Sequence, residues 1–121
     1  MRIEEFLFTA GTRLRDGDFL LSKTVLPVIE EFRDKLELQI EQIETEPQLT
    51  GLEALDDAKL EICQLYFDAL DLLELAVEDN IPQLASEILI RVQEAVETSR
   101  EVRRIAETHR DHLQQELGWE G

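Results

Sequence analysis

The residues of this chain that could do chemistry are carboxylates paired at helical spacing. Glu41 and Glu44 form one pair, and Asp68 and Asp71 form a second pair further along the chain. Residues three positions apart lie on the same side of a helix. Four carboxylates that face one another across two helices could hold Mg²⁺, which prefers oxygen ligands and can activate water for hydrolysis.

This arrangement resembles the MazG-like nucleoside triphosphate pyrophosphohydrolases, which use Glu-x-x-Glu on one helix and Glu-x-x-Asp on the next. The resemblance implies an all-α, Mg²⁺-dependent nucleotide pyrophosphohydrolase that works through Glu41, Glu44, Asp68 and Asp71. The chain departs from the family pattern at Asp68, where the family has Glu. No Lys or Arg stands near the second pair to bind a triphosphate. We therefore treat this hydrolase as the alternative to a non-enzymatic function.

A second candidate for metal binding is His109-x-x-His112, followed by Glu116, because all three side chains can share one side of a helix. A zinc or iron site would need a further carboxylate or imidazole from a facing helix. The Glu-x-x-His pattern of ferritin-like di-iron proteins is absent, since Ala106 stands three residues before His109. Arg110 would oppose a bound cation. We expect a structural role for this cluster and no cofactor.

Other catalytic groups have no recognisable setting in this chain. The serines Ser22, Ser86 and Ser99 lack the glycine pattern of a nucleophile elbow. The scattered glycines do not form a phosphate-binding loop. The single cysteine, Cys63, excludes an intramolecular disulfide, and we predict that it is a buried core thiol. We therefore predict no catalytic residues.

The charge and hydropathy of the chain narrow its partners. The 28 acidic residues outnumber the 12 basic ones, which gives a net charge of −16 that would repel nucleic acid. No apolar run reaches the roughly 18 residues of a membrane span, and the N-terminal apolar stretch is shorter than the roughly 7–15 residues of a secretory signal. We expect a cytoplasmic protein that binds neither nucleic acid nor membrane.

Apolar residues recur at spacings of three and four, which predicts helices. The short breaks between these periodic stretches favour antiparallel neighbours. We predict one all-α domain over 1–121, an antiparallel helical bundle. Its parts are a short N-terminal helix and turn at 1–17, three long helices at 24–45, 50–79 and 81–117, and a tail at 118–121.

Local signals predict where these helices begin and how their surfaces are stabilised. Pro27 is expected in the first turn of its helix, where no intrahelical N–H is needed. Thr50 opens a capping box, and Asn80 is the predicted N-cap of the last helix. Arg103 is predicted to pair with Glu107, four residues further on.

The helix that contains Leu60 to Val77 has more apolar surface than a two-helix hairpin can bury. We therefore predict that it is covered on several sides, by the bundle and by a second copy or an amphipathic helix of a partner. The predicted core consists of Val28, Phe32, Leu36, Ile62, Leu65, Ala69, Leu72, Leu73, Ala76, Ile88, Val92, Ala95 and Val102.

Acidic residues gather toward the end of the same helix, and we predict that Asp68, Asp71, Glu74, Glu78 and Asp79 form an interaction surface. Negative charge at a helix C-terminus is disfavoured by the helix dipole, so a basic partner is the functional explanation for it. The sequence predicts a small acidic, non-enzymatic interaction module, such as an adaptor, chaperone-like or regulatory protein. We expect a homodimer that also binds a basic or amphipathic-helical protein.

Overall fold

The computed structural model of the chain describes residues 1–45 and 53–116, and the side chains of residues 1–45 and 54–108. Within these ranges the predicted all-α bundle is confirmed, and no β-strand occurs. None of the described helices combines the length and the apolar character that crossing a bilayer requires. The elements are α1 (Ile3–Arg15), α2 (Ser22–Thr45), α3 (Glu53–Glu78), the 3-10 turn η1 (Pro82–Leu84) and α4 (Ala85–Glu116).

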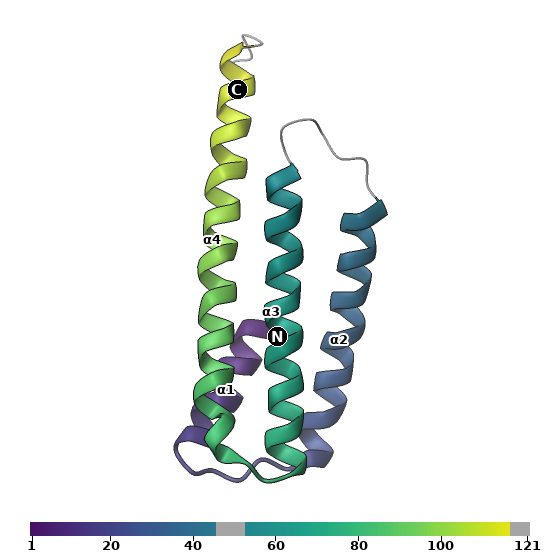
Figure 1. Cartoon of the computed structure of the whole chain (residues 1–121), viewed down its shortest axis with the longest axis vertical. Helices are drawn as coiled ribbons and strands as arrows, with labels where there is room; N and C mark the ends of the chain where they lie inside the picture. Colours follow the sequence, from purple (N-terminus) through teal and green to yellow (C-terminus); the bar gives the residue numbers. More distant parts are fainter. Residues whose placement is uncertain (46–52, 117–121) are drawn as a thin grey trace.

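The three long helices form one layer, and the short α1 packs on one side of it. α3 lies between α2 and α4, and Figure 1 shows the chain direction alternating from α2 to α3 to α4. α1 contacts α3 and α4 at the lower end of the view. With 13 residues against 26 in α3, α1 covers only part of the layer.

This difference in length divides the bundle into two parts. We call the part of the layer that packs against α1 the covered half. The part beyond the first residue of α1 is the open half, and it comprises α2 from Leu36 onward, α3 as far as Tyr66 and α4 from Val96 onward. The first residues of α1 line a pocket together with these three boundary residues, which places the division.

α1 is held against the layer by an apolar stripe and by one glycine. The ring of Phe6 lies 5.5 Å from the ring of Phe32 on α2, measured between centroids. Gly11 is buried against α4, and a Cβ atom added there would lie 2.8 Å from Cδ2 of Leu89. Gly11 therefore allows the backbone of α1 to approach α4 closely. The buried stripe consists of Phe6, Leu7, Ala10 and Leu14.

The start of α2 differs from the prediction. α2 begins at Ser22, so Pro27 is its sixth residue and lies inside the helix, and its predicted place in the first turn is wrong. The proline nitrogen cannot donate a hydrogen bond to the carbonyl of Lys23. Lys23 and Pro27 are both exposed, so the proline lies on the solvent side of α2. The capping box predicted at Thr50 lies outside the described residues.

The connection between α3 and α4 also differs from the prediction. Asn80 has a φ of 54°, and Ile81 donates its backbone N–H to the carbonyl of Ala76 over 2.9 Å. This is the geometry of a helix C-terminal cap, and Asn is one of the few residues that adopt it readily. Asn80 therefore ends α3, and it is not the N-cap of α4, which begins at Ala85 after the 3-10 turn.

The hydrophobic core is densest in the covered half, where all four helices meet. Its largest fully buried side chains include Leu7, Ile29, Leu73, Ile88 and Val92. Most of the predicted core residues are buried, because the α3–α4 contact follows the predicted apolar stripes. The exceptions are half-buried because they lie on the flanks of their helices; they are Val28, Ile62, Leu65, Leu72 and Val102.

Candidate functional site

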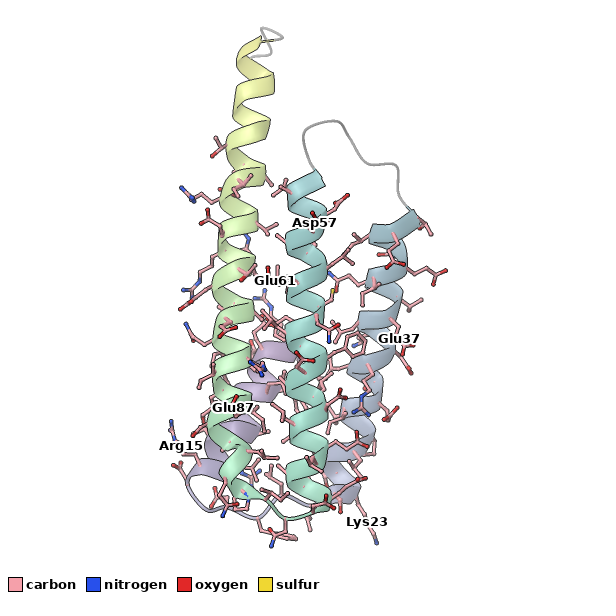
Figure 2. All side chains as sticks on the ribbon, in the orientation of Figure 1. Arg15, Lys23, Glu37, Asp57, Glu61 and Glu87 are labelled. Carbon is pink, nitrogen blue, oxygen red and sulfur yellow. The ribbon has the colours of Figure 1, made fainter. Side chains whose placement is uncertain are left out.

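Exposed carboxylates follow α2 and α3 along their length; Figure 2 labels Glu37 at the outer edge of α2 and Asp57 and Glu61 on α3. On α3 the side of Asp71 lies away from α1, since Asp71 is about 140° around the helix from Tyr66 at about 100° per residue. On α2 the carboxylates lie on the same side as Arg33, which contacts Asp71. We call this set the acidic face; it consists of Glu30, Glu37, Glu41 and Glu44 of α2 and Asp57, Glu61, Asp68, Asp71 and Glu78 of α3.

Arg33 is held between α2 and α3 by three carboxylates. Its guanidinium donates to Glu30 over 2.6 Å, to Asp71 over 2.7 Å and to Glu74. The Arg33 side chain is only 17% exposed. Burial opposes its charged form, but the hydrogen bonds to Glu74, Asp71 and Glu30 outweigh this effect and raise the pKa of Arg33. The network joins two helices through residues that are far apart in the sequence.

The structure places the predicted interaction residues in different environments. Asp71 and Glu74 are occupied by Arg33 within the fold. Asp68 accepts a hydrogen bond from the amide of Gln64 over 2.9 Å. Glu78 and Asp79 are exposed at the lower end of α3. The accessible negative charge therefore extends up the layer and is not confined to the end of α3.

Sequence reasoning missed the part that α2 plays in this surface. Glu30, Arg33 and Glu37 are spaced by three and four residues, so they share one side of α2. That spacing was a usable signal for a charged stripe on α2. Its pairing with the acids of α3 depends on how the two helices are aligned, which spacing within one helix does not reveal.

Above Arg33, carboxylates of α2 and α3 lie at similar heights along the bundle axis and form pairs. α2 and α3 run in opposite directions, so, counted at about 1.5 Å per residue from the contact of Arg33 with Asp71 and Glu74, Glu37 lies about 6 Å above Arg33 and close to the level of Asp68. Glu44 lies about 16.5 Å above Arg33 and level with Glu61. In the part of the chain with described side chains, no Lys or Arg forms an ion pair with these four carboxylates.

The four carboxylates suggested by the pyrophosphohydrolase pattern do not share one level. Asp71 is bound to Arg33. Glu41 and Glu44 lie about 12 Å and 16.5 Å above Arg33, whereas Asp68 lies about 6 Å above it. Across residues 1–45 and 54–108, no group of three His, Cys, Asp or Glu side chains is placed to hold a metal ion.

Two candidates from the sequence remain, the histidine cluster near the end of α4 and the single cysteine of α3. His109, His112 and Glu116 belong to the last turns of α4, and their side chains lie outside the described part of the chain. Cys63 is a free thiol that is fully buried, as predicted, and burial raises its pKa.

Arg103 does not form the ion pair that was predicted with Glu107. Among the described side chains, the pair at this end of α4 joins the neighbouring Arg104 to Glu101. Arg103 instead lines a groove beside the first turn of α1.

Comparison of this chain with models of protein families, with curated proteins and with solved structures gave no match. The acidic face is the largest charged surface that α2 and α3 share. Its most informative feature is a guanidinium already bound between carboxylates of two helices.

Proposed function

We propose that this protein is a non-enzymatic protein–protein interaction module whose acidic face binds a basic segment of a partner protein. Arg33 carries this proposal, because α2 and α3 hold its guanidinium between carboxylates from both helices. Such charge-assisted hydrogen bonds are among the strongest that side chains form. The same two helices present further carboxylates above Arg33.

The spacing of these carboxylates predicts the spacing of the basic residues on the partner. The level of Glu37 and Asp68 and the level of Glu44 and Glu61 are about 10.5 Å apart, which is the rise of about seven helical residues. A partner helix with Arg at positions i and i+7 would bring one guanidinium to each level. The net charge of −16 would accelerate the encounter with such a helix, and added salt would weaken it.

A synthetic helical peptide with Arg at i and i+7 tests this proposal by isothermal titration calorimetry. We expect saturable binding that weakens as the salt concentration rises. The double variant Glu37→Gln with Glu61→Gln should weaken binding several-fold, because each substitution removes an exposed carboxylate that pairs with an arginine of the peptide.

The matched control is Glu94→Gln with Glu107→Gln, which removes the same charge from exposed positions on α4. This control should bind the peptide with nearly unchanged affinity. Equal losses in the two double variants would mean that net charge alone attracts the peptide, and the acidic face would then have no specific role.

Self-association is a second interaction that we propose, and the length of α4 favours it. α4 has 32 residues against 26 in α3, and Figure 1 shows its upper end extending past α3. Ile105, near this end, is 43% exposed. Two copies could cover these helix ends by packing against each other around a twofold axis. Light scattering should then give twice the chain mass of 14.0 kDa, and a single-chain mass at every concentration would contradict the dimer.

A further inference from the structure

A groove of about 560 Å³ opens at the first turn of α1, on the side of the layer opposite the acidic face. Its base is the N-terminal end of α1, and its walls come from α2, α3 and α4. Small-molecule sites typically have volumes of about 300–1,000 Å³. The lining of this groove is more polar than the mostly apolar lining that is usual for such sites. The apolar part of this lining comes from all four helices and includes Phe8, Leu36, Ile62 and Val96.

Two arginines on one wall of the groove are free to bind an anion. Arg100 and Arg103 both line the groove, and neither forms an ion pair with any residue whose side chain is described. Arg104, the next residue along α4, is paired with Glu101 instead. The guanidinium group matches a carboxylate in shape and can bind it with two parallel hydrogen bonds.

The N-terminal end of α1, where the helix dipole is positive, forms the base of the groove. Arg2 occupies the N-cap position and makes no side-chain hydrogen bond to the first turn, so the first N–H groups of α1 have no side-chain acceptor there. Glu4 and Glu5 oppose an anion at this end, and Glu4 lies 3.8 Å from Arg2. The lining therefore holds three arginines and two glutamates, in a chain whose net charge is −16.

Tyr66 adds a hydrogen-bond donor to the groove. The residue is only 7% exposed, yet its hydroxyl reaches the open space of the groove and makes no hydrogen bond with another described residue. A hydroxyl that faces open space can bond to water, so it is available to a ligand as well. Burial, together with the nearby Glu4 and Cys63, raises the pKa of Tyr66 to about 12, so the hydroxyl is a neutral donor at pH 7.

We propose that this groove binds an amphiphilic carboxylate of the fatty-acid type. Arg100 and Arg103 hold the carboxylate, Tyr66 donates a further hydrogen bond to it, and the acyl chain lies on the apolar lining. The wall on α4 runs from Val96 to Arg103, or about 10.5 Å, which suits a medium-length acyl chain and is short for a docked helix. At physiological salt, charges more than about 8 Å away are screened, so the local arginines outweigh the distant acids. This site is independent of the acidic face.

Titration with decanoate below its micelle concentration tests the site by isothermal calorimetry. Tyr66 is the only tyrosine of the chain, so protein labelled at the tyrosine ring gives one NMR signal, located in the groove. We expect one saturable site and a shift of that signal. Arg100→Gln with Arg103→Gln should weaken binding about tenfold or more. Arg104→Gln, the matched control, should leave binding unchanged.

Two further ligands separate the contribution of the charge from that of the chain. Decanol has the chain without the charge, and acetate has the charge without the chain. Both should bind at least about tenfold more weakly than decanoate. Decanol binding as tightly as decanoate would overturn the role of the arginines, and the absence of saturable decanoate binding would overturn the site itself.

Two single variants place the ligand within the groove. Tyr66→Phe should weaken decanoate binding several-fold while keeping the ring in place. Ser99→Phe should fill the groove and abolish binding, with circular dichroism confirming that the helices remain formed. Undiminished binding by folded Ser99→Phe would show that decanoate binds elsewhere.

Discussion

The covered and open halves are built from the same three long helices, yet they differ in what faces their centre. Where α1 packs on the layer, the inward side chains are apolar and fully buried, as Leu73, Ile88 and Val92 show. Beyond the first residue of α1, the same helices direct Arg103 and the hydroxyl of Tyr66 toward a groove. A helix that covers part of a layer thus leaves the remainder available for binding. Most of the acidic face lies in this open half as well, on its other side.

The largest effect should separate a core leucine of the covered half from an apolar residue of the open half. Leu73→Ala should lower the free energy of unfolding by about 2–5 kcal/mol, because it leaves a cavity in a tightly packed core. Leu38→Ala, at a side chain that is 60% exposed, should change it by less than about 0.5 kcal/mol. Urea denaturation measures both, and similar losses would remove the distinction between the halves.

The close contact of α1 with α4 provides the next test. Gly11→Leu should lower the free energy of unfolding by about 1–3 kcal/mol, because the added side chain collides with Leu89. Thr9→Leu adds similar bulk on the exposed side of α1 and serves as the control. Equal stability of the two variants would contradict the claim that close packing of α1 against α4 stabilises the covered half.

A smaller effect should distinguish the arginine between α2 and α3 from an arginine at the surface. Arg33→Gln should lower the free energy of unfolding by about 1–2 kcal/mol, because three carboxylates lose their shared cation. Arg104→Gln, at a side chain that is 71% exposed, should leave the free energy of unfolding nearly unchanged. Thermal unfolding in low and high salt compares them, and equal losses would contradict the structural role of Arg33.

The smallest effect at neutral pH should come from Tyr66. Tyr66→Phe should change the free energy of unfolding by less than about 0.5 kcal/mol at pH 7, because the hydroxyl makes no hydrogen bond within the described residues. At high pH the two proteins should diverge. The pKa of Tyr66 is about 12 in the fold and 10.0 in the unfolded chain, so the unfolded state loses its proton first.

Wild-type stability should therefore fall as the pH rises from about 10 to about 12, and the fall should be smaller in Tyr66→Phe. Absorbance of the tyrosinate follows the titration of the only tyrosine directly. An ordinary tyrosine titration in the folded protein would mean that the surroundings of Tyr66 do not raise its pKa.

The sequence predicted the helices well, because spacings of three and four report directly on which side of a helix is buried. It failed at Asn80, since the residue types that cap the start of a helix also adopt the left-handed conformation that ends one. It also treated Asp71 and Glu74 as free, because their partner Arg33 lies on another helix, 38 residues before Asp71. The groove was not predictable, since it depends on where the first residue of α1 lies along three longer helices.

The measurement that tests the proposed function most directly is a map of backbone amide shifts during titration with the helical arginine peptide. Binding at the acidic face predicts that the largest shifts fall on α2 and α3, around Glu37, Glu44 and Glu61, and that α4 around Glu94 is unaffected. Shifts spread evenly over exposed acids of all helices, or no shifts at all, would contradict the proposal that this face is the binding surface.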